Sequence, residues 1–252
     1  MRREDLLAHP EKRLGPEARA RCRGYVERRA RREPVAYITG AREFWSLDLR
    51  VDPSAPIPRP ETEVLVGEAL RRLPPREEGR RLRVLDLGTG CGNVALALAS
   101  ERPGLFVVAT DVSGVALRTA KANAERLGLG GRVAFLGADW LGALRRGASF
   151  DAVVSNPPYL REGEWETLDW RTLSYEPRAA LVAGEDGREA HCVIAEGAPG
   201  VLRPGGWLLM EIGMDQAAGV RVLLEAARAY EDIEVIPDLE GRDRVVAARR
   251  RR

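Results

Sequence analysis

Hydrophobic residues along this chain gather into short apolar runs, separated by longer stretches with apolar residues at helical spacing. Runs of strand length occur at 83–87, 105–111, 132–139, 150–155, 206–212, 233–238 and 244–249. Helices are predicted between them at 93–101, 113–128, 141–146, 187–202 and 215–230. Strands that are apolar on both faces and alternate with helices indicate a parallel sheet covered by helices on each side.

The link between the last two predicted strands is too short for a parallel connection. It consists of the five residues LEGRD at 239–243, whereas a crossover between parallel strands needs roughly a dozen residues or more. The final strand should therefore run antiparallel. Because βαβ crossovers are right-handed, the pattern predicts an α/β protein with a doubly wound, mostly parallel sheet of seven strands.

The chain before the first apolar strand has a different character. Residues 16–32 predict a helix with one thin apolar stripe, formed by Cys22, Tyr25, Val26 and Ala30. A lone helix of this length is marginally stable in water. We therefore expect the stripe to pack on the main domain or on other helices.

A connector rich in proline lies between this helix and the apolar strands. Segment 42–51 alternates and predicts a strand or hairpin, 52–60 predicts extended chain, and a helix follows at about 61–72. We divide the chain into a short N-terminal helical segment at 1–42, a hairpin and Pro-rich connector at 43–58, and the sheet domain at 59–252.

Length and composition predict a cytoplasmic protein. The 252 residues, 44% of them hydrophobic, suffice for one large α/β domain with a small appendage. No apolar run approaches the roughly 18 residues of a membrane helix, and residues 1–15 contain no signal-peptide region. The three cysteines, Cys22, Cys91 and Cys192, have neither metal-type spacing nor an even number for disulfides. They predict a reducing compartment and no metal site.

The net charge of +2 is unevenly distributed along the chain. Residues 1–42 contain twelve Arg or Lys and six Asp or Glu, and four arginines occupy 249–252, so the body between them is acidic. The basic N-terminal segment and the basic C-terminal residues can bind an RNA-rich partner. The alternative is that these charges are only solvated, and the sequence leaves both interpretations open.

A glycine-rich loop follows the first apolar strand. The segment DLGTGCG at 86–92 lets a ligand approach the backbone closely, ahead of a helix whose N-terminus presents unpaired N–H groups. Asp111 ends the next strand, where an acid can accept hydrogen bonds from ribose hydroxyls. The third strand ends at Asp139 and Trp140, a polar edge and a flat ring that can flank an adenine.

The spacing of the glycines narrows the choice of ligand. The pattern G-x-G-x-G differs from the G-x-G-x-x-G of dinucleotide sites and favours a single adenosine without pyrophosphate. A sulfonium ligand such as S-adenosylmethionine suits a loop that begins with Asp86. Three alternatives stay open: Asp86 as a turn acceptor, Trp140 as a core residue and Cys91 as a small loop filler. The candidate cofactor residues are Asp86, Gly88, Thr89, Gly90, Cys91, Gly92, Asp111, Asp139, Trp140 and Asn156.

The fourth strand ends in SNPPY at 155–159, where two consecutive prolines impose a rigid turn. The side-chain oxygen of Asn156 and the carbonyl of Pro157 form a pair of acceptors for the two hydrogens of a planar NH₂ group. Tyr159 can lie against the flat face of that group. Such acceptors polarise a poorly nucleophilic nitrogen as it attacks an activated methyl group. The turn predicts methylation of an exocyclic or amide nitrogen, with Asn156, Pro157 and Tyr159 as the catalytic group.

Several segments together resemble those of one known family. LDLGTGCG, SNPPY, EPVAYITGAREFW and IPRPETE are similar to the peptide chain release factor N5-glutamine methyltransferases (PrmC/HemK), and the resemblance covers essentially the whole chain. It implies the class I S-adenosylmethionine-dependent methyltransferase fold, S-adenosylmethionine as methyl donor, and the glutamine of the Gly-Gly-Gln tip of class-1 release factors as substrate. It implies that the substrate is bound by Asn156, Pro157, Pro158, Tyr159, Arg59 and Glu61.

The sequence departs from the family at its front and leaves other functions open. Members usually carry a longer helical domain, whereas only residues 1–43 precede the FWSLDL strand here. An adenine-amino methyltransferase acting on DNA or RNA would use the same turn, but the acidic body and the absence of a spare domain disfavour it. A non-catalytic partner subunit is disfavoured by the intact loop and by Asn156. We expect a monomer with no membrane contact and no direct nucleic-acid substrate.

Overall fold

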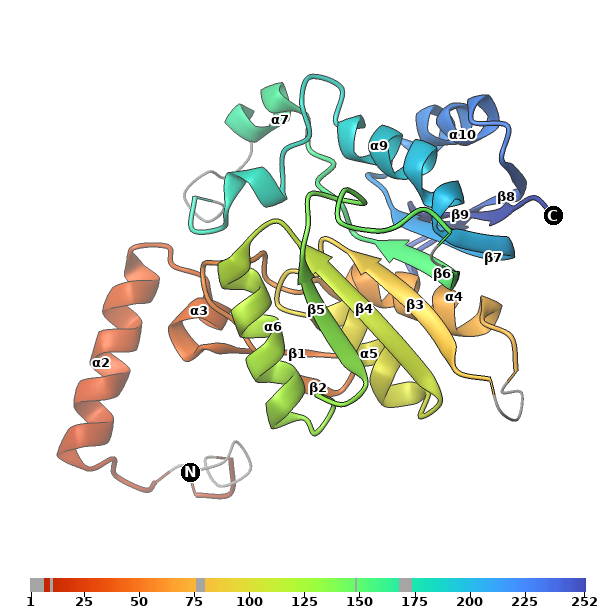
Figure 1. Ribbon diagram of the computed structural model, residues 1–252. Helices are drawn as coiled ribbons and strands as arrows, with labels where there is room; N and C mark the ends of the chain where they lie inside the picture. Colours follow the sequence, from red (N-terminus) through yellow and green to blue (C-terminus); the bar gives the residue numbers. More distant parts are fainter. Residues whose placement is uncertain (1–6, 10, 76–79, 148, 168–173) are drawn as a thin grey trace.

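A seven-stranded sheet forms the centre of the computed structural model, which describes residues 7–9, 11–75, 80–147, 149–167 and 174–252. Its order is β5-β4-β3-β6-β7-β9-β8 (Figure 1). The strands are β3 (Leu82–Leu87), β4 (Leu105–Asp111), β5 (Val133–Gly137), β6 (Phe150–Ser155), β7 (Leu202–Glu211), β8 (Tyr230–Pro237) and β9 (Asp243–Arg250). Strands β3 to β7 pair in parallel, and β9 runs antiparallel to β7 and β8. The predicted doubly wound sheet and its antiparallel last strand are confirmed.

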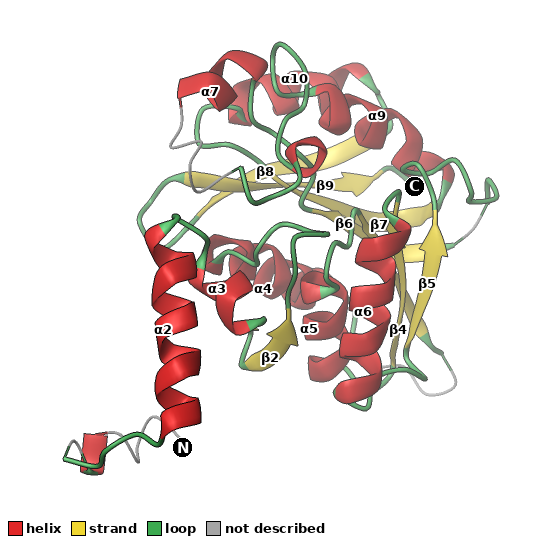
Figure 2. Cartoon of the chain, turned by 90° about the vertical axis from the view of Figure 1, so that its left-hand side faces the viewer, coloured by secondary structure: helices red, strands yellow, loops and turns green. Residues whose placement is uncertain are grey.

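Helices cover both faces of the sheet (Figure 2). One face carries α4 (Glu63–Arg72), α5 (Asn93–Glu101) and α6 (Gly114–Arg126), and the other carries α9 (Glu189–Gly197) and α10 (Ala217–Ala226). Val84 of β3 belongs to the buried cluster on the first face, whereas its neighbour Leu85 belongs to the cluster on the second. This alternation explains why the central strands are apolar at every position.

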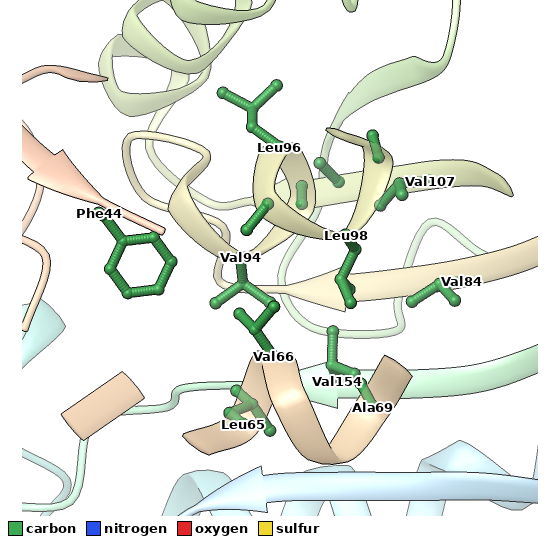
Figure 3. Close-up of a cluster of buried hydrophobic side chains, with 14 of the residues drawn as sticks. Phe44, Leu65, Val66, Ala69, Val84, Val94, Leu96, Leu98, Val107 and Val154 are labelled. Carbon is green, nitrogen blue, oxygen red and sulfur yellow. The ribbon is translucent and has the colours of Figure 1, made fainter. Parts of the chain in front are cut away.

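The first cluster holds the connector against the main sheet (Figure 3). Phe44 packs there beside Val94 of α5 and Leu65 of α4, and each of these side chains is at most 3% exposed. Full burial of an apolar side chain of this size stabilises the fold by about 1.5–3 kcal/mol. The connector is therefore an integral part of the core.

The predicted hairpin in the connector is confirmed. Its strands β1 (Ala41–Phe44) and β2 (Leu47–Arg50) pair antiparallel. Asn123 of α6 accepts a hydrogen bond from the Arg50 N–H (2.8 Å) and donates one to the Arg50 carbonyl (2.9 Å). The Thr119 hydroxyl donates to Asp52 (2.8 Å). A short 3₁₀ helix, η1 (Pro60–Thr62), then leads into α4.

The N-terminal helix forms as predicted, but its apolar stripe does not pack. α2 (Pro16–Ala30) has no buried residue, and Val26 is 68% exposed. Figure 1 shows α2 standing beside the sheet domain. It is joined to α3 (Val35–Thr39) by polar contacts of Arg28, which pairs with Glu33 and donates to the Tyr37 carbonyl. Packing of the stripe on the main domain, one of the two expected arrangements, is therefore not found among the described residues, and packing on other helices stays a prediction.

Segment 141–146 is not the predicted helix. It forms consecutive turns, in which the Gly142 N–H donates to the Asp139 carbonyl and the Leu144 N–H donates to the Leu141 carbonyl. Two glycines, Gly142 and Gly147, flank only four other residues, and a helix of that length gains too few hydrogen bonds to offset nucleation.

Two other predicted helices are shorter than expected. Within 187–202, the α-helix is confined to α9, and η3 (Ala198–Gly200) follows, where Pro199 removes a helical N–H donor. Within 215–230, α10 ends at Ala226 and Tyr230 already belongs to β8. The described residues also form α7 (Glu162–Thr167) and the 3₁₀ turn η2 (Arg178–Ala180). None of the described helices combines the length and hydropathy of a membrane span.

Candidate active site

A cleft with two adjoining chambers lies at the carboxyl ends of β3, β4 and β6. The chambers have volumes of about 310 Å³ and about 300 Å³. The sheet order reverses between β3 and β6, and ligand sites of doubly wound folds lie at such a switch point. The residues that line both chambers form their shared wall: Pro56, Gly88, Gly90, Asn156, Pro158 and Ala180.

The first chamber lies over the glycine loop and the ends of β4 and β5. Its lining includes Asp111, Asp139 and Trp140, three of the candidate cofactor residues. Gly88 and Gly90 line it with φ angles of 70° and 55°, in the left-handed region that favours glycine. The sequence prediction that these residues share one site agrees with their placement.

Asp111 organises the first chamber through both of its carboxylate oxygens. Oδ2 accepts the Gly90 N–H (2.8 Å), and Oδ1 accepts the Ser113 N–H (2.8 Å). The carboxylate therefore joins the end of β4 to the glycine loop. Each oxygen still has a further lone pair for a ligand hydroxyl.

Asp86 and Gly92 do not line either chamber. Asp86 is 1% exposed, and its Oδ2 accepts a hydrogen bond from the Thr89 hydroxyl (2.6 Å). Burial raises the pKa of Asp86 to about 7. Gly92 lies where an added Cβ would be 3.1 Å from Ala120 and from Leu96. Both residues support the glycine loop without lining a chamber. For Asp86, this arrangement corresponds to the alternative in which it accepts a hydrogen bond within the turn.

Cys91 and Trp140 each line a chamber and also pack in or against the hydrophobic core. Cys91 is 1% exposed, and burial raises the pKa of its thiol to about 12, so it stays protonated at neutral pH. Trp140 lines the first chamber and also packs against the second core cluster. Its φ of 46° belongs to the left-handed region, which turns the chain sharply after Asp139.

The second chamber contains the turn that follows β6. Its lining includes Asn156, Pro157, Pro158 and Tyr159, together with Arg59 and Thr62 from the segment around η1. Asn156 Nδ2 donates a hydrogen bond to Thr62 Oγ1 (3.1 Å). The two prolines follow Ser155, the last residue of β6, as the sequence predicts.

Of the two RPETE residues that the resemblance assigns to substrate binding, Arg59 lines the chamber and Glu61 does not. Glu61 is exposed, while its neighbour Thr62 is fully buried and lines the chamber. The 3₁₀ turn η1 determines which of these two neighbouring side chains faces the chamber. Sequence reasoning missed Thr62, although it lies within the same RPETE segment.

A buried glutamate fastens the connector over the cleft. Glu176 is 5% exposed, accepts the Ile57 N–H at Oε2 (3.0 Å) and forms an ion pair with Arg59. The Tyr37 hydroxyl donates to the carbonyl of Ala55, which also lies in the Pro-rich segment (2.7 Å). Both contacts join distant parts of the chain, so no local sequence pattern indicated them.

Gln216, at the N-cap of α10, contacts the turn that follows β6. The Gln216 side chain donates from Nε2 to the Tyr159 carbonyl (2.8 Å) and to the Gly187 carbonyl (3.1 Å). Burial raises the pKa of Tyr159 to about 12, so its hydroxyl remains a donor at neutral pH. Glu211, the last residue of β7, is 1% exposed. Neither Gln216 nor Glu211 was among the predicted site residues, although an acid that ends a buried strand, as Glu211 does, is a usable signal.

The fold and the cleft define a class I methyltransferase. The methyltransferase small domain matches residues 68–184, and the PrmC N-terminal domain matches residues 1–40. A methyltransferase from Pyrococcus furiosus has a similar fold at a TM-score of 0.61, with 19% identity over 90% of this chain and 99% of that chain. Human methyltransferase 10 domain containing protein is similar at a TM-score of 0.60, with 18% identity over 82% of this chain and 89% of that chain.

The chain belongs to the release factor glutamine methyltransferase family. It is 45% identical over 249 residues to the release factor glutamine methyltransferase of Moorella thermoacetica, covering 99% of this chain and 86% of that protein. It is 46% identical over 244 residues to that of Xylella fastidiosa (strain 9a5c), covering 97% of this chain and 86% of the relative. The family resemblance inferred from the motifs is therefore confirmed.

Proposed function

We propose that this enzyme transfers a methyl group from S-adenosylmethionine to the side-chain amide nitrogen of a glutamine in class-1 release factors. Two kinds of support bear on this proposal. The relatives that cover nearly the whole chain are named release factor glutamine methyltransferases. The observation that carries the chemistry is the position of Asn156 on the wall shared by the two chambers.

The first chamber has the features that S-adenosylmethionine requires. Asp111 offers acceptors for ribose hydroxyls, Gly88 and Gly90 admit a ligand close to the backbone, and Trp140 offers a flat apolar ring. When bound, S-adenosylmethionine supplies a methyl group on a positively charged sulfur, which is a strongly activated leaving group. The acidic side chains of Asp111 and Asp139 suit the charge of such a ligand.

The second chamber offers acceptors for the glutamine amide. Because Asn156 Nδ2 donates to Thr62, the Asn156 Oδ1 atom is left to accept from a substrate N–H. The Pro157 carbonyl is a second acceptor beside it, and Tyr159 lies in the same chamber. Two acceptors on one NH₂ group orient it and draw electron density onto its nitrogen, which stabilises the charge that develops during attack. As the N–C bond forms, the C–S bond of the donor would break to leave S-adenosylhomocysteine, and the nitrogen would release one proton to water.

This arrangement also explains a preference for an amide over a carboxylate. A glutamate side chain would bring oxygen lone pairs against Asn156 Oδ1 and the Pro157 carbonyl, and such a pairing is repulsive. An adenine amino group has the same two hydrogens, but the names of the relatives favour a release factor.

The test is incubation of the enzyme with labelled S-adenosylmethionine and a purified class-1 release factor, followed by peptide mapping. We expect one added methyl group on the glutamine of the Gly-Gly-Gln tip and none on a release factor in which that glutamine is replaced by glutamate. Label on the Gln→Glu release factor, or transfer to an oligonucleotide instead, would overturn the proposal.

A further inference from the structure

Gln216 is a buried amide that joins three loops next to the second chamber. It is the N-cap of α10, is 4% exposed and lines neither chamber. Its Nε2 atom donates to the Tyr159 carbonyl (2.8 Å), in the turn after β6, and to the Gly187 carbonyl (3.1 Å), ahead of α9. Its Oε1 atom accepts the Gly213 N–H (2.9 Å), in the loop after β7. Both amide hydrogens are therefore committed to backbone carbonyls.

These three contacts fix the direction in which the Gln216 amide faces. An amide offers two donors on its nitrogen and lone pairs on its oxygen. Turning it by 180° would set Oε1 against two carbonyl oxygens and the NH₂ group against the Gly213 N–H. Each of these pairings is repulsive and leaves buried backbone groups without a partner, which is costly. Gln216 therefore keeps one orientation, and it holds the Tyr159 carbonyl beside the Gly187 carbonyl.

Gly187 shows how closely the backbone packs at this contact. It is buried, and its φ of 70° lies in the left-handed region that favours glycine. A Cβ added at Gly187 would lie 2.4 Å from the Tyr159 carbonyl oxygen and 2.7 Å from Gln216 Nε2, so one of these groups would have to move. Glycine at this position leaves the room in which Gln216 reaches the Tyr159 carbonyl.

The turn from Ser155 to Tyr159 is held at its two ends. The two prolines between them lack N–H donors, so they form no backbone hydrogen bonds as donors. At one end the Ser155 hydroxyl donates to a carbonyl of β3 (2.8 Å), and at the other the Tyr159 carbonyl accepts from Gln216 (2.8 Å). Because the prolines also fix φ, the two ends determine where the Pro157 carbonyl points.

We propose that Gln216 is a positioning residue that holds the Pro157 carbonyl, the second acceptor for the substrate amide, in place through Tyr159. The first acceptor is held separately, because Asn156 Nδ2 donates to Thr62 Oγ1 (3.1 Å). Displacing a positioned group by about 1 Å can cost about 10²-fold in rate. The identity of the substrate amide rests on the proposed function, whereas the positioning of the turn does not.

The first test measures the kinetics and the donor binding of Gln216→Met with a purified release factor. Methionine has a similar size but no amide, so the Tyr159 and Gly187 carbonyls lose their donor. We expect kcat to fall about 10–100-fold, while the calorimetric affinity for S-adenosylmethionine changes by less than about twofold. A kcat within about twofold of the wild type would overturn the inference and leave the proposed function intact.

Asp151→Leu is a matched control for loss of stability. Asp151 is 4% exposed and lies on the same strand as Ser155, near the opposite end of β6. It accepts the Arg83 N–H (2.7 Å) and pairs with Arg203 (2.7 Å). Asp151→Leu should lower the urea midpoint at least as much as Gln216→Met but keep kcat within about twofold of the wild type. Equal losses of kcat would mean that kcat follows stability, and the inference would fail.

Gly187→Ala tests the same contact with Gln216 left in place. The added Cβ must push the Tyr159 carbonyl away, so we expect kcat to fall about tenfold or more. Gly128→Ala is its matched control, because Gly128 has the same φ of 70° and an added Cβ would meet no atom of the described residues within 4 Å. It introduces the same backbone strain and should leave kcat unchanged. Equal kcat values for the two glycine variants would overturn the inference.

The last test does not depend on activity. The N–H groups of Tyr159 and Leu160 donate to the Leu181 carbonyl (3.2 Å and 2.9 Å), so their hydrogen exchange reports opening of the turn. In Gln216→Met both should exchange about tenfold faster, while the Gly90 N–H in the glycine loop keeps its rate. If the wild type methylates no release factor but the variant shows this local change, the proposed function fails and the inference stands. Unchanged exchange at Tyr159 and Leu160 would overturn the inference.

Discussion

The two chambers of the cleft are built in different ways. The first is formed mainly by backbone turns at the ends of adjacent strands, with Gly88, Gly90 and Asp111 in fixed conformations. The second depends on side chains from segments far apart in the sequence, such as Thr62 beside Asn156 and Glu176 beside Arg59. A chamber of backbone turns can hold a ligand common to many enzymes, whereas one of distant side chains can be specific to one substrate. Mutations in the two chambers should therefore affect different kinetic constants.

The largest effect should come from the shared wall. Asn156→Ala removes an acceptor that is needed when the nitrogen attacks, and we expect kcat to fall about 10²–10³-fold, as for loss of one preorganised polar contact in other enzymes. Donor affinity, measured by calorimetry, should change little. Steady-state kinetics with a purified release factor provides the measurement.

Asn93→Ala is a matched control for this substitution. Asn93 also lines the second chamber and loses the same amide group, but it does not belong to the shared wall. Its kcat should fall far less. Equal losses in the two variants would mean that Asn156 has no special position, and the contrast between the chambers would lose its basis.

The next largest effect should appear in the first chamber. Asp111→Ala removes acceptors from the ligand and from the Gly90 and Ser113 N–H groups. Loss of hydrogen bonds to a charged group costs about 1.5–3 kcal/mol, or roughly a 10–100-fold loss of donor affinity. Calorimetric titration with S-adenosylmethionine measures this loss of donor affinity. Asp111→Asn keeps one acceptor, so its donor affinity should lie between those of the wild type and of Asp111→Ala. An unchanged donor affinity in Asp111→Ala would exclude this residue from the donor site.

A smaller effect is expected from the segment that covers the cleft. Glu176→Gln keeps the shape of the side chain but removes its charge, so the pair with Arg59 is lost while the Ile57 N–H keeps an acceptor. Arg59 is 42% exposed in its side chain and can be solvated instead. We expect the KM for the release factor to rise severalfold, with donor affinity unchanged. A change in donor affinity without a change in that KM would contradict the division of roles.

The contrast between the chambers also explains what the sequence allowed us to predict. The sequence predicted one shared site because strand ends in a doubly wound sheet converge on one edge, and the first chamber is lined by Gly88, Gly90, Asp111, Asp139 and Trp140. The position of each residue in its strand or turn was harder to predict. Asp86 is still within β3 and lines neither chamber, so its carboxylate holds the loop through Thr89 instead of contacting a ligand.

The rest of the site depends on contacts that leave no local pattern. Glu176 and Ile57 are 119 positions apart, and nothing near either residue indicates the other. Whether Glu61 or Thr62 faces the chamber depends on the exact position of the 3₁₀ turn η1 along the chain. A short segment rich in proline does not reveal that position. The exposure of α2 is of the same kind, because an apolar stripe indicates a preferred face and not its partner.

The smallest effect is expected outside the cleft, on α2. Val26 is 68% exposed, so Val26→Ser exposes no core and should change the free energy of unfolding by no more than about 0.5 kcal/mol. Val66 of α4 is fully buried, and the same substitution there leaves a cavity and an unpaired hydroxyl. Val66→Ser should cost about 2–4 kcal/mol. Urea unfolding of both variants provides the comparison, and a loss at Val26 approaching that at Val66 would mean that α2 packs against the protein in solution.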